Sequence, residues 1–521
     1  MDNEVYDVAV VGYGPVGQML ALLLGQKGYR VAAFERWHEV YPLPRAVHYD
    51  DEIARVLQAA GVADQVAPVI ESSGFYEWRN ADRELLLLLD WNGMGPSGWP
   101  LSNIFSQPDL ESILDARARA FPTVQVNRGW EALSAAQDDD CVTLTVRRGE
   151  SARPGEWTPT SEARTIRARY LIGADGANSI VRQWMGVTMT DLGFRYDWFV
   201  VDIKPHGQRE WAPYAWQWCN PARPTTIVPS GPGRRRWEFM RLPEESKEDF
   251  QGAETAWRLL EPWDVTPQNA TLERSAMYTF QARWADEWRV GRMLLAGDSA
   301  HLTPPFAGQG LCSGVRDAIN LAWHLDLVLS NRAPERILDT YTSERTVNVQ
   351  MFIGFAVELG KMICITDPQL AAMRDAQFFA AQKKPALAPP PPPPMRLGPG
   401  ILHQGDPLAG LLFVQGQVSH NGSSGLFDDV VGRGFVLLSN QGDPATALSA
   451  ESRAFFESIG GKTACVSADG PVVDLDGTYA QWFAQNQASV VLARPDFYIF
   501  GAAPTLDGAE HLIADLRRQL A

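Results

Sequence analysis

The sequence predicts an α/β protein with a Rossmann-like main domain, an antiparallel sheet inserted into that domain, and a smaller α/β domain at the C-terminal end. Three patterns indicate this class. An apolar run, a glycine-rich turn, a helical pattern and a second apolar run follow one another in residues 5–34. Residues from about 190 to 275 alternate β-branched, aromatic and polar side chains between glycine- and proline-rich turns, which is typical of an antiparallel sheet. Strand-like and helical runs alternate again after residue 400.

The first strand, helix and second strand form a dinucleotide-binding fingerprint. The apolar run Val5–Val11 leads into a G-x-G-x-x-G motif, and the second strand ends in an acid. Gly12 permits the tight turn, Gly14 lets the backbone approach a pyrophosphate, and Gly17 lets the helix pack closely on the strand. Glu35 can accept hydrogen bonds from an adenosine ribose. We therefore expect a cofactor that contains ADP.

A polar segment follows the second strand and precedes a helix. Arg45 stands where it could reach a phosphate or the edge of a flavin, and His48 follows it closely. Asp50 and Asp51 are typical of helix N-caps and first-turn acids, and this interpretation competes with a catalytic one. Further along the chain, Gln107 begins a helix with proline in its first turn, and it either contacts a cofactor or only starts the helix.

Two further acid–glycine pairs stand at strand ends. Asp175 and Gly176 follow one apolar run, and Gly297 and Asp298 follow the run 293–296. A strand that places an acid beside a helix N-terminus suits a ligand with hydroxyls near the acid and an electron-rich edge near the helix. An ordinary strand–loop–helix joint with a capping Asp is the alternative. The helix after residue 310 is expected to be amphipathic, with apolar residues at helical spacing: Val315, Ile319, Ala322, Leu325 and Leu329.

Composition disfavours several classes of protein. The chain has 521 residues, 45% of them apolar, and a formal net charge of −16, so we expect several domains and neither a nucleic-acid partner nor an anionic membrane surface. The N-terminal residues lack the basic region of a signal peptide, and the apolar runs are too short to span a bilayer. Five cysteines lack a C-x-x-C motif and eight histidines lack ligand spacing. A cytoplasmic protein with reduced cysteines and no metal site is expected.

The sheet region and the tail contain further signals. Six consecutive prolines, 389–394, predict a semi-rigid spacer. The tail beyond them holds one cysteine, Cys465, so a dithiol relay is not expected there. Five tryptophans of the sheet region are either core residues or the wall of a pocket for a flat aromatic ligand: Trp198, Trp211, Trp216, Trp218 and Trp237.

The motifs together resemble one family. The chain is similar to the group A flavoprotein monooxygenases, the class of para-hydroxybenzoate and phenol hydroxylases, in the segments VAVVGYGPVG, YPLPRAVHYDDE, YLIGADGANSIVR, RRRWEFM and MLLAGDSAHLTPPFAGQGLCSGVRDAINLAWHL. Within that class it most resembles the 3-(3-hydroxyphenyl)propionate hydroxylases, and the tail is similar more loosely. The resemblance implies an FAD-binding domain (1–75, 102–187 and 276–365), a substrate-binding domain (76–101 and 188–275), a proline-rich linker (366–400) and a thioredoxin-like C-terminal domain (401–521).

The resemblance also implies a role for each motif. The first glycine turn would bind the FAD pyrophosphate, and Asp298 would bind the ribityl chain. The mid-chain acid–glycine pair would support FAD and the passing NADH or NADPH. Backbone N–H groups from Gly308 to Leu311 would lie against the flavin pyrimidine edge, and they do not depend on Cys312, which replaces an Asn common in relatives. The residues expected to bind cofactor are therefore Gly12, Gly14, Pro15, Gly17, Glu35, Arg36, Arg45, Gln107, Asp175, Gly176, Asp298, Pro305, Gly308, Gly310 and Leu311.

The implied reaction is the hydroxylation of a phenolic substrate such as 3-hydroxyphenylpropionate. NADH or NADPH reduces FAD, O2 adds to give a flavin C4a-hydroperoxide, and one oxygen atom passes to the ring ortho or para to a hydroxyl. Asp50 is expected to assist as a base toward the phenol, with His48 as the alternative base.

Other functions share parts of this pattern. A flavin halogenase is disfavoured because the W-x-W-x-I-P signature is absent, since Cys219 and Asn220 follow Trp218. A polyketide-tailoring hydroxylase or Baeyer–Villiger monooxygenase shares every motif and stays open, as does a non-enzymatic flavin-binding scaffold. The tail is interpreted as structural or oligomeric, for example in a homodimer.

Overall fold

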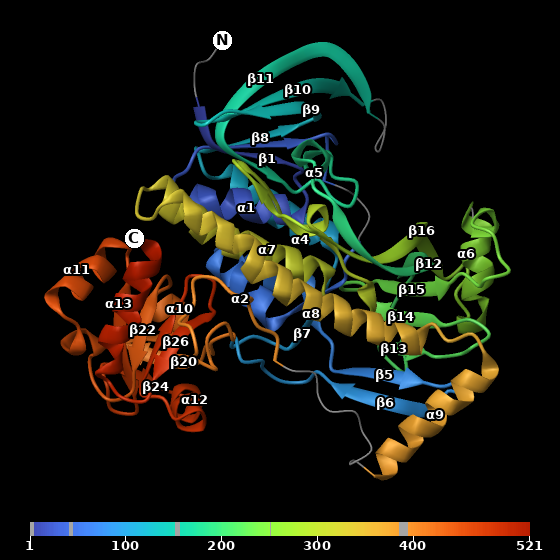
Figure 1. Ribbon diagram of the computed structural model, residues 1–521. Helices are drawn as coiled ribbons and strands as arrows, with labels where there is room; N and C mark the ends of the chain where they lie inside the picture. The colour runs from blue at the N-terminus through green and yellow to red at the C-terminus, as the bar shows by residue number, and fades with distance from the viewer. Residues whose placement is uncertain (1–4, 41–44, 152–156, 251, 385–393) are drawn as a thin grey trace.

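The computed structural model describes residues 5–40, 45–151, 157–250, 252–384 and 394–521. Three bodies of the chain surround a set of long helices (Figure 1). A first sheet lies at the top of that view, a second sheet at the lower right, and the C-terminal part at the lower left. Segments that are far apart in the sequence therefore meet around the helices.

The first sheet contains the predicted strand–turn–helix–strand unit. Its strands are β1 (Val5–Val11), β2 (Val31–Glu35), β8 (Val124–Arg128), β9 (Trp130–Gln137), β10 (Val142–Glu150), β11 (Thr158–Gly173), β17 (Arg289–Val290) and β18 (Met293–Leu295). The order β18, β11, β1, β2, β8 is parallel throughout. The inner half of β1 is fully apolar and buried, as expected of a central parallel strand.

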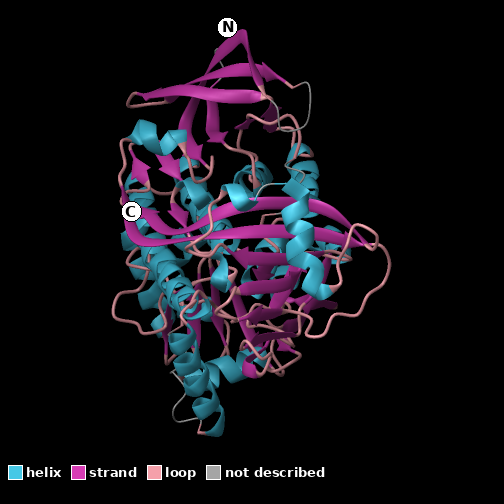
Figure 2. Cartoon of the chain, turned by 90° about the vertical axis from the view of Figure 1, so that its right-hand side faces the viewer, coloured by secondary structure: helices cyan, strands magenta, loops and turns pink. Residues whose placement is uncertain are grey.

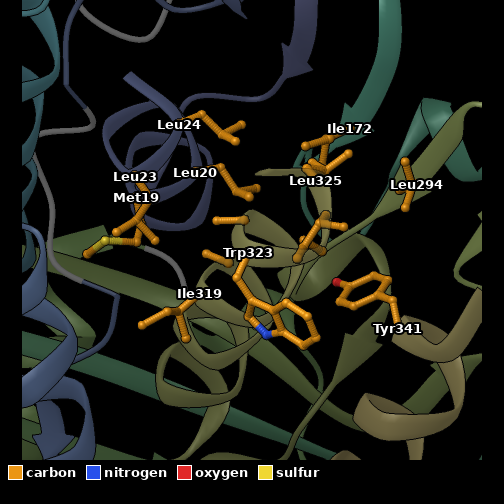
Figure 3. Close-up of a cluster of buried hydrophobic side chains, with 14 of the residues drawn as sticks. Met19, Leu20, Leu23, Leu24, Ile172, Leu294, Ile319, Trp323, Leu325 and Tyr341 are labelled. Carbon is orange, nitrogen blue, oxygen red and sulfur yellow. The ribbon is translucent and has the colours of Figure 1, made fainter. Parts of the chain in front are cut away.

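Helices cover this sheet and link it to the rest of the molecule. They are α1 (Pro15–Gln26), α4 (Gln107–Arg119), α5 (Ile180–Met185), α7 (Gly310–Leu329) and α8 (Asp339–Ile363). Figure 3 shows the apolar cluster in which α1, α7 and α8 meet strands β11 and β18. The labelled side chains are Met19, Leu20, Leu23, Leu24, Ile172, Leu294, Ile319, Trp323, Leu325 and Tyr341.

The predicted helix is confirmed as α7 and its five named apolar residues are buried, but its polar residues are buried as well. Arg316, Asp317, Asn320 and His324 are all at most 3% exposed. The polar side of α7 faces α2 (Asp51–Ala59), α8 and the C-terminal part, so its polar groups bond to protein instead of water.

The second sheet has the order β19, β16, β12, β15, β14, β13, β5, β6. Its strands are β5 (Phe75–Arg79), β6 (Leu85–Asp90), β12 (Met189–Pro205), β13 (Trp216–Trp218), β14 (Thr225–Pro229), β15 (Arg235–Met240), β16 (Ala270–Ala285) and β19 (His301–Leu302). Every neighbouring pair is antiparallel except β13 and β5, which are parallel. Strands β5 and β6 come from an earlier part of the chain than the rest of this sheet. Long strands cross the middle of the molecule (Figure 2).

The two faces of the second sheet have different neighbours. One face packs against α6 (Gly252–Leu260). The other packs against α8 and α9 (Pro368–Lys383) and faces the loop that follows β2, where Nη1 of Arg236 donates to the carbonyl oxygen of Arg45 at 2.7 Å. A small sheet joins the two regions, with β7 (Ser102–Phe105) between β3 (His48–Asp50) and β4 (Ile70–Ser72). His48 and Asp50 are thereby fixed by backbone pairing to Ile104 and Ser102.

The predicted linker 366–400 is in part a helix, α9 (Pro368–Lys383). Asp367 caps this helix and Pro368 stands in its first turn, where proline is tolerated, so nothing in the segment prevents helix formation. The proline run lies outside the described residues except for Pro394. In the described part of the chain no single helix is long and apolar enough to cross a membrane. One pair of helices bent by 114°, Glu335–Ile363 with Pro368–Lys383, could cross a membrane as judged by its length and composition only.

The C-terminal part has a seven-stranded sheet in the order β21, β20, β24, β23, β22, β25, β26. The strands are β20 (Gln417–His420), β21 (Ser423–Leu426), β22 (Val436–Ser439), β23 (Lys462–Ser467), β24 (Val472–Asp474), β25 (Val490–Ala493) and β26 (Ile499–Ala503). The helices are α10 (Phe427–Val430), α11 (Ala450–Ser458), α12 (Thr478–Asn486) and α13 (Gly508–Leu520). Strands β22, β23 and β24 are parallel and the outer pairs antiparallel, so the sheet is mixed.

Candidate active site

The turn between β1 and α1 leaves room for an anion. Gly12 has a φ of 92°, and a Cβ there would lie 2.3 Å from the carbonyl oxygen of Ala174. A Cβ on Gly17 would lie 2.1 Å from the carbonyl oxygen of Gly12, so both glycines are required by the protein itself. A Cβ on Gly14 would meet no described atom within 4 Å. The open space before Gly14, Pro15 and the free N–H groups of α1 fits a pyrophosphate.

Glu35 lies beside this turn at the end of β2. Its two carboxylate oxygens accept hydrogen bonds from the amides of Tyr13 and Trp37, each at 3.0 Å. Each oxygen keeps a lone pair, so the carboxylate can still accept from a ribose hydroxyl. Arg36 is exposed and its guanidinium lies 4.5 Å from the centre of the Trp37 ring. The geometry fits the expected adenosine end of the cofactor.

Asp175 has a structural role that explains its position. Its Oδ1 accepts from the hydroxyl of Ser179 at 2.6 Å, and its Oδ2 accepts from the amides of Ile180 and Val181. The side chain therefore holds the start of α5, while Gly176 makes the turn with a φ of 79°. Direct contact of this pair with FAD or with the nicotinamide stays a prediction.

Asp298 is accessible to solvent although protein surrounds much of its side chain. Its side chain is exposed, yet desolvation by the surrounding protein raises its pKa, against the opposing charges of His301 and Arg45. The turn that presents it is rigid, because the Gly297 amide donates to Asp317 at 2.9 Å. An accessible acid in such a position is suited to bind the hydroxyls of a ribityl chain.

The loop before α7 leads into a helix N-terminus with unbonded backbone donors. Pro305 is exposed, Gly308 has a φ of 63°, and α7 begins at Gly310. The N–H groups of Gly310 and Leu311 precede the first intrahelical bond and have no partner within the helix. Such donors can stabilise negative charge on a flavin ring. The glycine turn, the accessible acid and this loop together fit FAD.

Gln107 holds the loop that contains Arg45. Its side-chain oxygen accepts from the amides of Arg45 and Ala46, at 3.2 and 2.8 Å. Its side-chain nitrogen donates to Glu111 at 2.7 Å. These bonds show Gln107 positioning the Arg45 loop, and its contact with a flavin stays a prediction.

Asp50 caps α2 and is also part of an ion pair. Its Oδ1 accepts from the Ile53 amide at 3.1 Å, as the capping alternative predicted. Its Oδ2 accepts from Nε2 of Gln309 at 3.0 Å and from Nη2 of Arg316 at 2.5 Å. Burial acts to raise the pKa of Asp50, but Arg316, His48 and the Ile53 amide outweigh it and lower that pKa. Asp50 is therefore an ionised hydrogen-bond acceptor and a weak base.

His48 is better suited to take a proton. Burial lowers its pKa below the ordinary 6.5, against the opposing effect of Asp50, so the ring is neutral at pH 7. The ring lies against the loop before α7, since a Cβ on Gly308 would be 3.0 Å from its Nδ1. Its other neighbour is Trp91, at 5.7 Å between ring centres, which stacks on Tyr76 at 5.2 Å. Neither aromatic residue was predicted, although both stand in the tryptophan-rich segment 75–101.

The five tryptophans of the second sheet divide between its two faces. Trp198 lies on the face that packs against α8, and its ring is 5.6 Å from that of Phe306, measured between ring centres. Phe306 follows Pro305, so Trp198 is the one of the five that approaches the expected flavin loop. The others belong to or border the core under α6: Trp211, Trp216, Trp218 and Trp237.

The sheet face opposite Arg45 holds balanced charges. Arg236 bonds to Asp202 at 2.6 and 2.9 Å and lies 3.5 Å from Glu238. Burial raises the pKa of Glu238, with Arg236 and Arg274 acting in the opposite direction. The basic groups Arg236 and Arg274 therefore lie near two acidic groups, those of Asp202 and Glu238. Within the described ranges, no cluster of three His, Cys, Asp or Glu side chains could hold a metal ion.

Known proteins are similar in sequence to almost the whole of this chain. A family model described as FAD binding domain matches residues 5–356, and one described as HcaD C-terminal domain matches residues 410–519. A probable NADH-specific resorcinol 4-hydroxylase of Rhodococcus jostii (strain RHA1) is 38% identical, over 99% of this chain and 95% of that protein. A 3-(3-hydroxy-phenyl)propionate/3-hydroxycinnamic acid hydroxylase of Escherichia coli (strain K12) is 31% identical, over 96% and 92%.

Solved structures have the same fold. The flavin-dependent monooxygenase PieE, solved with FAD and substrate, matches with a TM-score of 0.81 and 22% identity over 100% of both chains. Aklavinone-11 hydroxylase, solved with FAD and aklavinone, matches with a TM-score of 0.79 and 25% identity over 100% of both. The matched FAD-binding model includes the glycine turn, Glu35, Asp298 and the start of α7. The chain therefore belongs to the FAD-binding domain family and is an FAD-dependent aromatic hydroxylase.

Proposed function

We propose that this enzyme uses NADH and O2 to hydroxylate a small, uncharged phenol. The observation that supports this most is the pair His48 and Asp50, held together beside the expected flavin loop. Bound FAD would accept a hydride from the nicotinamide and activate O2 for transfer of one oxygen atom to an aromatic ring. NADH is favoured over NADPH because the Rhodococcus relative is named as NADH-specific.

The protein's own residues prepare the phenol. Neutral His48 accepts the single proton of the phenol hydroxyl, which makes the ring electron-rich. Asp50 stays ionised beside it, and its negative charge stabilises the protonated His48 that results. General-base assistance of this kind contributes typically about 10²–10⁴-fold. Trp91 and Tyr76 form an aromatic wall beside His48.

The charge balance of the site favours an uncharged substrate. Arg236 is engaged by Asp202 and Glu238, and Arg316 is engaged by Asp50 and Glu52. A substrate carboxylate could pair with either of these two guanidinium groups only by displacing an acid that already neutralises it. A dihydroxybenzene such as resorcinol meets no such penalty, whereas 3-(3-hydroxyphenyl)propionate does.

The remaining parts have supporting roles in this proposal. The second sheet, inserted in the FAD-binding domain, binds the substrate. The C-terminal part is a thioredoxin-like domain without redox chemistry, because Cys465 is its one cysteine. The enzyme acts in the cytoplasm, and a homodimer stays a prediction.

The test measures NADH, product and hydrogen peroxide together. Resorcinol should give a higher kcat/KM than 3-(3-hydroxyphenyl)propionate, by about 10-fold or more. Asp50→Asn and His48→Ala should reduce flavin normally but release most of the oxygen as hydrogen peroxide. Asp64→Asn, an exposed acid in α3 (Ala63–Val66), is the matched control and should stay coupled. Coupled hydroxylation by both site variants would refute the proposed roles.

A further inference from the structure

The C-terminal part docks on the main domain through buried charges. Arg55 of α2 pairs with Asp428 at 2.8 and 3.0 Å, and Arg494 pairs with Glu344 of α8 at 2.6 and 2.9 Å. All four residues are at most 7% exposed. Separating either pair would leave an unpaired charge in the interior, so the two parts are held in one geometry.

One contact of this interface leads directly to Asp50. The hydroxyl of Tyr498, on the C-terminal side, donates to Oε1 of Glu52 at 2.8 Å. The other oxygen of Glu52 accepts from Nε of Arg316 at 2.6 Å. Nη2 of the same guanidinium donates to Asp50 at 2.5 Å. Three consecutive hydrogen bonds therefore join Tyr498 to the acid of the active site.

The side chains joined by these three hydrogen bonds have little freedom to rearrange. Tyr498, Glu52 and Arg316 are 3%, 6% and 3% exposed. The Arg316 guanidinium also lies 4.8 Å from the centre of the Phe352 ring, and its Nη1 donates to Gln309 at 2.8 Å. Gln309 in turn donates to Asp50, so Arg316 orients that carboxylate both directly and through a second side chain.

The hydroxyl of Tyr498 fixes the orientation of the Glu52 carboxylate. With the hydroxyl present, Oε1 is occupied and Oε2 faces Arg316. Without it, Oε1 would be a buried acceptor with no donor, and the carboxylate would rotate to share the Arg316 donors. Any such rotation changes the hydrogen bonds that Arg316 offers to Asp50.

We propose that Tyr498 is a positioning residue for Asp50, acting through Glu52 and Arg316, so that the C-terminal part completes the hydroxylation site. Tyr498 itself does not touch the substrate. The proposal rests on the proposed role of Asp50, and it assigns a function to a domain that lacks redox chemistry. It also explains why that domain is joined so tightly to α2 and α8.

The test uses the holoenzyme with Tyr498→Phe, which keeps the ring and removes the hydroxyl. FAD content and the rate of flavin reduction by NADH should match the wild type. The fraction of NADH recovered as hydrogen peroxide, with resorcinol present, should rise several-fold. Tyr479→Phe is the matched control, because that hydroxyl accepts from the Gly416 amide within the C-terminal part. It should leave the peroxide fraction unchanged.

A cycle with Asp50→Asn separates this proposal from the proposed function. The double variant should release no more peroxide than Asp50→Asn alone, because both changes act through one carboxylate. Wild-type coupling in Tyr498→Phe beside an uncoupled Asp50→Asn would overturn the positioning role alone. Coupled hydroxylation by Asp50→Asn would refute the role of Asp50 itself. Urea unfolding of the wild type, Tyr498→Phe, Asp50→Asn and the double variant tests the same connection. Shifts of the unfolding midpoint that simply add in the double variant would overturn the connection between Tyr498 and Asp50.

Discussion

Replacing Gly14 with alanine separates cofactor binding from folding. Gly14 has φ −78° and ψ −169°, an extended conformation open to any residue, and an added Cβ meets no described atom within 4 Å. The apoprotein should therefore keep its thermal midpoint. With FAD bound, the methyl group occupies the space where the pyrophosphate approaches α1. Loss of one hydrogen bond to a charged group costs about 1.5–3 kcal/mol, which corresponds to a roughly 10- to 100-fold rise in Kd.

Titration of the apoprotein with FAD, followed by flavin fluorescence, measures this change. Gly354→Ala in α8 is the matched control, because a Cβ there also meets no described atom within 4 Å. It should leave the Kd for FAD unchanged and stabilise the helix by up to about 1 kcal/mol. Gly17→Ala should instead prevent normal folding, because its Cβ would lie 2.1 Å from a backbone oxygen. Unchanged FAD affinity in Gly14→Ala would refute the placement of the pyrophosphate.

Three further outcomes are expected. Asp298→Ala should weaken FAD binding about 10- to 100-fold through loss of a charge-assisted hydrogen bond, and full retention of flavin on gel filtration would remove Asp298 as the ribityl ligand. Cys465→Ser should leave turnover intact, and a large loss of turnover in a folded variant would contradict a tail without redox chemistry. Because burial lowers the pKa of His48 below its ordinary value of 6.5, the midpoint of the decline in coupled hydroxylation with falling pH should lie below 6.5. A midpoint above pH 6.5, or a decline that persists unchanged in His48→Ala, would contradict His48 as the base.

The FAD-binding parts were predictable because their steric demands are local. Gly17 is required by an oxygen atom of the same turn, whereas Gly12 is required by Ala174, which follows the neighbouring strand β11. The apolar runs of β1 and β2 and the acid at the end of β2 follow from the same short stretch. The position of Asp298 after β18 was likewise set by one strand and one turn.

The parts that were missed depend on pairing between distant segments. The parallel pairing of β5 with β13 joins residues 75–79 to residues 216–218. The burial of the polar residues of α7 was not predicted, because no local pattern shows that α8 and the C-terminal part cover them. Tyr498 and Glu52 are 446 positions apart, and their bond arises only when two separate parts of the chain dock. Such contacts leave no periodicity that could be recognised in one sequence.

The central claim is that this enzyme transfers one atom of O2 to an uncharged phenol. The most direct measurement is the reaction of the holoenzyme with NADH and resorcinol under isotopically labelled O2, with the product identified by mass spectrometry and NMR. The expected result is an aromatic product with one added hydroxyl that contains the label, formed in step with NADH oxidation. A ring-expanded product, an unlabelled product, or oxidation of NADH to hydrogen peroxide alone would contradict the claim.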